Sequence, residues 1–171
     1  MPKLPIRPLG DHEHIIPSVT DLHCALIGEL IATCTTVENY LEMLIWAFLK
    51  IDEKDGRIIT LKMDAVNKIR MIRLFAELHI SDEGQLKTIK ALMAKIDALR
   101  LDRNFIVHGT WGTLLPDKVP IAASLRRISD FDQVVSETFP EVRSTLIADT
   151  ASAQAELDDL LSRLPTLLNA A

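Results

Sequence analysis

Apolar residues recur every three or four positions between residues 20 and 50, and this period constrains the fold more than any other feature of the chain. The residues that carry it are Ile27, Leu30, Ile31, Cys34, Val37, Leu41, Leu44, Ile45 and Phe48. This spacing is that of one face of an α-helix, and it predicts a helix from about residue 21 to residue 50. Met43, Trp46 and Ala47 lie on the opposite side. The second half of this helix is therefore expected to pack against a partner subunit as well as an internal core.

Three further segments have the same helical period. Residues 60–78, 81–109 and 138–165 are predicted to be helices, and Pro165 is expected to end the last of them. Residues 52–56 have the composition of a turn between the first two helices. Four long amphipathic helices favour an all-α fold, an antiparallel four-helix bundle.

The rest of the chain has no helical period. Residues 1–19 contain four prolines and are expected to form an irregular N-terminal arm, which leaves residues 20–171 as a single helical-bundle domain. Residues 110–115 and 119–125 predict a short hairpin or irregular insertion after the third long helix, although Pro120 weakens the second strand.

Composition and charge restrict the classes of function. The chain has 171 residues, of which 48% are hydrophobic and 25% charged, so a disordered or multidomain protein is excluded. Its most apolar run, residues 41–51, contains Glu42 and Lys50 and is far shorter than the roughly 20 residues of a membrane span. No membrane association is expected. The first residues lack a signal-peptide pattern, which predicts a cytoplasmic location.

The net charge of −5 disfavours a protein that coats nucleic acid by charge alone. Residues 86–108 are an exception, because five basic and two acidic side chains give this segment a local charge of +3. An anionic ligand is therefore expected to approach the middle of the chain.

The end of the third predicted helix contains the polar groups best suited to chemistry. Helical spacing places Arg100, Arg103, Asn104 and His108 on one arc of about 140°, and this arc also contains Asp97. A guanidinium matches phosphate oxygens with a planar, permanently charged fork, and an imidazole exchanges protons near neutral pH. Such a set could cleave RNA without metal, since the imidazole moves protons while the guanidinium stabilises the phosphorane.

The residues from Arg103 to Gly109, Arg-Asn-Phe-Ile-Val-His-Gly, resemble the arginine, four-to-six-residue gap, histidine motif of the HEPN superfamily. The setting is also similar, with a long amphipathic first helix, the motif near the end of the third helix and a closing helix. The resemblance thus covers most of residues 21–168.

This resemblance implies a helical bundle that dimerises with its two motifs facing one another. Active HEPN members are metal-independent endoribonucleases, often toxins or defence effectors, that leave a 2′,3′-cyclic phosphate. Carried over to this chain, Arg103 is the expected phosphate-binding residue, His108 the acid-base residue and Asn104 the polar auxiliary. The implied partners are a second copy, an RNA or nucleotide ligand, and an antitoxin-type protein. Other members are inactive, so a non-catalytic dimeric scaffold or nucleotide-binding module is the alternative.

Two more residues are candidate auxiliaries. Glu38, at the edge of the apolar stripe of the first helix, would need a positive partner if partly buried, and the hypothesis is that it orients Arg103. Solvation at the edge of the stripe is the competing interpretation. Trp111 follows the motif and could stack on a base, although a residue of this size is rather expected to pack over the end of the bundle.

No metal or cofactor is expected. The sequence has no Gly-rich phosphate loop, paired-cysteine metal site or nucleophile-elbow serine. Residues 11–14, Asp-His-Glu-His, contain metal-ligand types, but they lie in the expected arm without a second cluster to complete a coordination shell.

Overall fold

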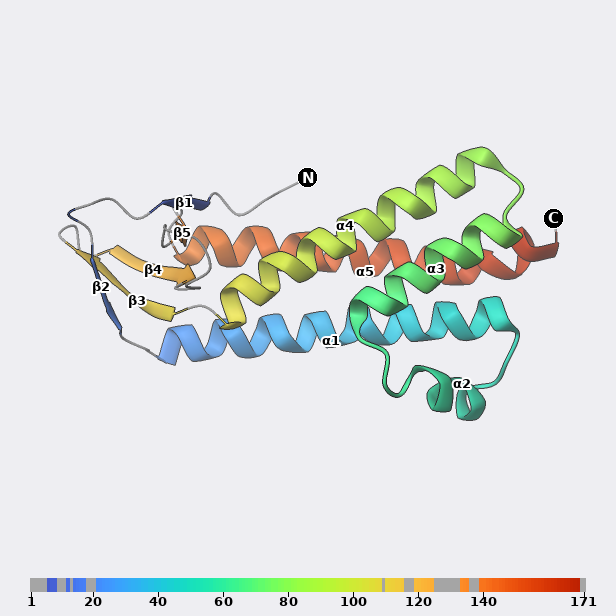
Figure 1. The fold of residues 1–171 in the computed structure, drawn as a ribbon, viewed down its shortest axis with the longest axis horizontal. Helices are drawn as coiled ribbons and strands as arrows, with labels where there is room; N and C mark the ends of the chain where they lie inside the picture. Colours follow the sequence, from blue (N-terminus) through green and yellow to red (C-terminus); the bar gives the residue numbers. More distant parts are fainter. Residues whose placement is uncertain are drawn as a thin grey trace. The chain divides into compact units, whose positions relative to one another are not determined.

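The structure is a computed structural model, and most of the residues that it describes are helical, as the sequence periodicity predicts (Figure 1). It describes the backbone of residues 6–8, 12, 14–17, 21–108, 110–115, 119–124, 133–135 and 139–169, and the side chains of residues 12, 21, 24–108 and 145–169. These residues fall into two compact units. The sheet unit lies within residues 1–32 and 98–149, and the helical unit within residues 33–97 and 150–171.

The helices agree with the predicted ones at most of their ends. They are α1 (Asp21–Leu49), α2 (Glu53–Thr60), α3 (Ala65–His79), α4 (Glu83–His108) and α5 (Phe139–Asn169). Three expectations are wrong. The helix expected from residue 60 begins at Ala65, because Thr60 is the last residue of α2. The segment expected as a turn at residues 52–56 lies largely in α2, and Pro165 lies inside α5. The buried Leu164 anchors α5 at this point, so packing offsets the hydrogen bond that the proline cannot donate.

Three aspartates cap the starts of helices in the helical unit, and one residue in the left-handed conformation ends α1. The carboxylates of Asp52, Asp64 and Asp82 each accept a hydrogen bond from the backbone N–H three residues later, at 2.9, 2.8 and 2.7 Å. At the end of α1, the N–H of Ile51 donates to the carbonyl of Trp46 and that of Lys50 to the carbonyl of Ala47. This pair of bonds is a Schellman motif, and Lys50 has the positive φ of 54° that it requires.

The core of the helical unit consists of aliphatic rows from four helices and one aromatic side chain, Phe48. Its buried residues are Val37, Leu41, Leu44, Ile45 and Phe48 of α1, Ile69, Ile72 and Ala76 of α3, Ile89, Leu92, Met93 and Ile96 of α4, and Ala153, Leu157, Leu160 and Leu164 of α5. Every row follows the three-four spacing of its helix. The apolar periodicity of the sequence therefore identified most of the buried surface, although Ile31 of the predicted stripe is 43% exposed.

Polar contacts join the same four helices in a closed order. Glu42 of α1 binds Lys68 of α3, and Glu77 of α3 binds Lys90 of α4, both at 2.6 Å. Lys95 of α4 binds Glu156 of α5 at 2.6 Å. The hydroxyl of Tyr40 in α1 donates to Asp158 of α5 at 3.2 Å, which completes the order α1, α3, α4, α5 and back to α1.

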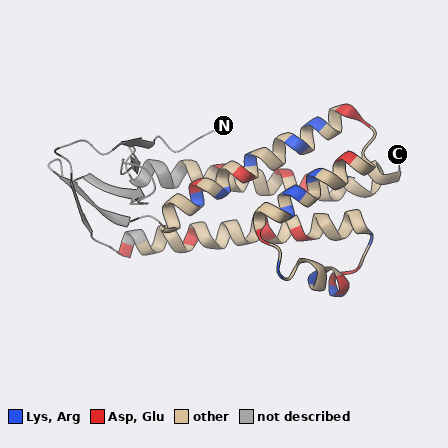
Figure 2. Ribbon diagram, viewed as in Figure 1, with Lys and Arg blue, Asp and Glu red and all other residues tan. Residues whose placement is uncertain are grey.

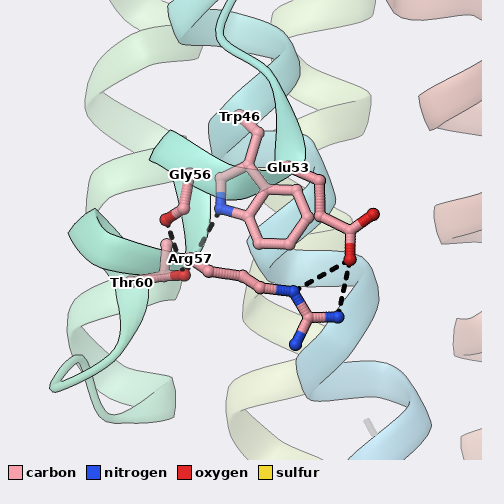
Figure 3. A network of polar contacts seen from close by, with 5 residues as sticks. All are labelled: Trp46, Glu53, Gly56, Arg57 and Thr60. Atoms are coloured by element: carbon pink, nitrogen blue, oxygen red, sulfur yellow. Dashed lines mark hydrogen bonds and ion pairs between the residues drawn. The ribbon is translucent and has the colours of Figure 1, made fainter.

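Helix α2 packs on α1 through its smallest residue. Gly56 is buried against the indole of Trp46, where an added Cβ would stand only 2.5 Å from the ring carbons. The indole N–H donates to the hydroxyl of the buried Thr60 at 3.3 Å, and this hydroxyl donates to the carbonyl of Gly56 at 3.0 Å (Figure 3). On the outer side, Arg57 pairs with Glu53. Tertiary packing of this kind explains why a turn-like composition forms a helix.

The sheet unit contains more strand than the sequence predicts. Its strands are β1 (Ile6–Pro8), β2 (His14–Pro17), β3 (Thr110–Leu115), β4 (Val119–Ser124) and β5 (Gln133–Val135), and they form an antiparallel sheet in the order β1-β5-β4-β3-β2. The hairpin of β3 and β4 was predicted. The expectation of a wholly irregular arm at residues 1–19 is wrong, because β1 and β2 form the two edges of this sheet.

The prolines of the sheet occupy positions that need no backbone donor. Pro8 and Pro17 end the edge strands β1 and β2. Pro120 lies in an interior strand opposite Thr113, but β5 pairs only with Ala123 and Ser124 at the other end of β4. Among the described residues, Pro120 therefore has a paired strand on one side alone, which is where a sheet tolerates proline best.

Candidate functional site

Arg103 lies on the buried side of α4. Leu99 and Ile106 are 5% and 0% exposed, and Arg103 is four residues after the first and three before the second. These intervals place the three side chains in one row along the helix. Counting back by the same intervals reaches Ile96, Leu92 and Ile89, which are also buried. Arg103 thus occupies an apolar position of the repeat.

The guanidinium of Arg103 is partly shielded from solvent. The side chain is half-buried, and its Nε atom is buried without a hydrogen bond within the described part of the chain. Arg103 also interacts with another residue, as do Arg100 and Asp102. Because a buried charge is costly unless it is compensated, a permanent cation in this row needs a specific role in structure or in ligand binding.

Of the other polar candidates on α4, His108 is the exposed one. Asn104 and Arg100 are half-buried, and His108 is exposed as the last residue of α4. Helix geometry separates the directions of Arg103 and His108 by about 140°. The predicted polar arc therefore begins in the buried row at Arg103 and ends in solvent at His108.

The two remaining candidates are Glu38 and Trp111. Glu38 is half-buried in α1 within the helical unit, where it interacts with a neighbouring group, and its pairing with Arg103 stays a hypothesis. Trp111 is the second residue of β3, opposite Ala122, and its side chain lies outside the described residues. The neighbouring Gly109 also lies outside them.

The excess of positive charge in residues 86–108 is smaller in the structure than a count of charged residues in the sequence implies. Lys90 and Lys95 of α4 are paired with Glu77 and Glu156 at 2.6 Å each. Figure 2 shows Lys and Arg interspersed with Asp and Glu along α3 and α4. Paired lysines contribute little to a field that attracts a polyanion. Of the other basic residues within 86–108, Lys87 is exposed, and Arg100 and Arg103 each interact with another residue.

Among the residues whose side chains are described, no group of three or more His, Cys, Asp or Glu is arranged to hold a metal ion. Of residues 11–14, only His12 falls within that set. No described helix combines the length and the apolar character needed to span a membrane.

Comparison of the chain with protein-family models, with curated proteins and with solved structures found no match. The chemistry of the candidate site is therefore argued from its own residues.

The sequence analysis missed a hollow between α4 and α5 in the helical unit. It has a volume of about 390 Å³ and lies along residues 85–92 of α4 and 152–163 of α5. One signal for it was present in the sequence: small side chains gather in this part of α5, at Ala148, Ala151, Ser152, Ala153 and Ala155.

Proposed function

We propose that this chain is a HEPN-like helical protein and that the end of α4 carries a metal-independent endoribonuclease site. Arg103 would bind the scissile phosphate, His108 would transfer protons, and Asn104 would fix the imidazole or a ribose hydroxyl. Arg100 and Trp111 would extend the site toward flanking phosphates and bases, and Glu38 would orient Arg103. The observation that carries the proposal is the cation at position 103 within an otherwise apolar row.

The finer architecture belongs to the same proposal. An antiparallel four-helix bundle of α1, α3, α4 and α5 accounts for the closed order of polar contacts in the helical unit. HEPN bundles pair so that two motifs face one another. Such a homodimer would bring together arginines and histidines that the geometry of a single helix separates by about 140°.

The proposed reaction needs only these side chains. The 2′-hydroxyl of the RNA attacks the adjacent phosphorus, its proton passes to one imidazole, and the bond to the 5′-oxygen breaks as that oxygen receives a proton. The products are a 2′,3′-cyclic phosphate and a 5′-hydroxyl. A guanidinium stabilises the additional charge on the phosphorane, and proton transfer by a histidine contributes about 10² to 10⁴ in rate.

The test is incubation of the purified chain with mixed RNAs, with and without a chelator, followed by analysis of the product ends. We expect cyclic-phosphate ends that are unaffected by the chelator, and a loss of about 100-fold or more in His108→Ala. His79→Ala is the matched control, because His79 is also an exposed histidine that ends a helix. Undiminished cleavage by His108→Ala would refute the catalytic assignment.

A non-catalytic dimeric scaffold or nucleotide-binding module is the second candidate. It is favoured by the pairing of Lys90 and Lys95 with carboxylates and by exposed apolar side chains. The exposed apolar side chains of α2, of α3 and of the segment between them are Ile58, Ile59, Leu61, Val66, Leu74 and Leu78. An antitoxin-type protein or a second copy could cover them. If wild-type protein is a dimer that cleaves none of the RNAs, this candidate replaces the enzyme.

A further inference from the structure

The hollow between α4 and α5 has the composition of a small-molecule site. Its volume of about 390 Å³ lies within the usual range for ligand pockets of roughly 300–1,000 Å³. The buried side chains of Ile89, Leu92 and Leu160 form an apolar floor, and Ala155 adds little bulk beside them. The floor is aliphatic, which suits the hydrocarbon part of a ligand.

Two carboxylates and two cations stand at the rim of the hollow. Glu156 and Asp159 line it from positions three residues apart on α5, where their side chains share one face of the helix. Asp159 pairs with Arg163, which also lines the hollow, at 2.7 Å. Glu156 is the carboxylate whose cation, Lys95, comes from outside the lining.

A primary ammonium already occupies part of this rim. The Nζ of Lys95, which approaches from α4, lies 2.6 Å from Glu156 and 2.9 Å from the hydroxyl of Ser152. That hydroxyl in turn donates to Glu156 at 3.2 Å. The carboxylate and hydroxyl thus form a receptor of the size and polarity of an ammonium group. Glu156 and Lys95 are 47% and 26% exposed, so their pair is weak and open to competition.

We propose that the hollow binds small organic amines, with the hydrocarbon part on the floor of Ile89, Leu92 and Leu160 and the ammonium at Glu156, in place of that of Lys95. Lys95 is an internal competitor for the same carboxylate. This site uses none of the residues assigned to RNA cleavage, so it stands whether or not the chain is a ribonuclease.

The experiment uses the full chain and three six-carbon probes of equal length: hexylamine, hexan-1-ol and hexanoate. Amide NMR shifts report where each probe binds and how tightly. We expect hexylamine to shift the amides of residues 85–92 and 152–163 with a dissociation constant of about 1 mM, a reasonable value for a ligand of this size. Hexan-1-ol should bind more weakly and hexanoate most weakly.

Substitutions separate the contributions of charge and of space. Glu156→Gln should weaken hexylamine about threefold and leave hexan-1-ol nearly unchanged, whereas Lys95→Met should tighten hexylamine by a similar factor because it removes the competitor. Ala155→Leu should fill the hollow and weaken both probes about tenfold. Ala151→Leu is its matched control, because Ala151 is an exposed alanine of α5 outside the lining.

Three results would overturn the proposal. The first is hexanoate binding as tightly as hexylamine, which would remove the role of the rim charge. The second is equal binding by Ala155→Leu and Ala151→Leu. The third is the absence of amide shifts with any probe at 10-fold the expected dissociation constant.

Discussion

The indole of Trp46 occupies the space that a side chain at position 56 would need: a Cβ on Gly56 would meet three ring carbons at 2.5 to 2.6 Å. Real Cβ atoms do not approach ring carbons this closely. Either the indole or the whole of α2 must move to accept any other residue. Gly56 is therefore fixed by the space available and not by the backbone conformation of a turn.

Gly56→Ala should lower the free energy of unfolding by about 1–2 kcal/mol. Overpacking costs roughly 1–3 kcal/mol, and the better helix propensity of alanine returns up to about 1 kcal/mol. Urea unfolding measures the change. Gly28→Ala is the control, because Gly28 lies inside α1 with open space around it, and alanine should stabilise the protein there. Equal effects at the two glycines would contradict the packing argument.

Thr60→Val should lower the free energy of unfolding by about 1–2 kcal/mol, since it keeps the shape of the side chain and removes its hydroxyl. Trp46 then loses the acceptor of its indole N–H in a partly buried site. Thr60→Ser, which keeps the hydroxyl, should retain most of the stability, apart from the small cost of the missing methyl group. A serine variant as unstable as the valine variant would show that the hydrogen bond contributes nothing.

Substitution of Glu42 should lower the free energy of unfolding more than substitution of Lys68. The side chain of Lys68 is 6% exposed and that of Glu42 is 23% exposed, so loss of the carboxylate leaves the more buried charge uncompensated. We expect Glu42→Gln to cost about 2–3 kcal/mol in thermal or urea unfolding and Lys68→Met to cost clearly less. The double variant should recover most of the loss. A larger effect of Lys68→Met than of Glu42→Gln would reverse this assignment.

Lys50→Gly should raise the free energy of unfolding by about 1 kcal/mol. The residue has a φ of 54°, a left-handed conformation that glycine adopts without the steric cost of a side chain. Lys54→Gly, at an exposed position of α2, should have the opposite effect, because glycine is unfavourable inside a helix. If Lys50→Gly destabilises the protein, the side chain of Lys50 stabilises the fold by more than its left-handed backbone conformation costs.

Arg103→Leu should separate stability from the proposed activity. Leucine continues the row of Leu99 and Ile106, so the free energy of unfolding should stay within about 1 kcal/mol of wild type or rise. RNA cleavage should fall by about 100-fold or more, because the phosphorane loses its guanidinium. Retained cleavage by a stable Arg103→Leu variant would exclude the phosphate-binding role.

The long helices could be predicted because their signal is local and repeated. The three-four spacing of α1 and α4 persists over many turns, and the predicted ends of these helices lie within two residues of the observed ones. Capping of these helices is also local: the carboxylate of Asp82 accepts a hydrogen bond from the backbone N–H of Gln85. The side chain of Gln85 accepts a hydrogen bond from Arg163 of α5, and no local rule predicts that contact.

The elements missed by prediction depend on distant contacts. Helix α2 has the residues of a turn and packs through Gly56 on an indole from another helix. Strands β1 and β2 pair with β5 and β3, more than 90 residues away in the chain. The position of Arg103 in the buried row of α4 could have been predicted, because counting by three and four from Ile89 arrives at residue 103. The prediction grouped this arginine with the polar residues around it and so did not use that spacing.

The closed order of contacts among α1, α3, α4 and α5 does not include α2, which the indole of Trp46 and the hydroxyl of Thr60 hold in place. Residues 53–60 can consequently undock while the four long helices remain assembled. Their amide protons would then exchange with solvent by local opening at a lower free energy than global unfolding, so this short helix is the part of the helical unit that first becomes accessible to a protease.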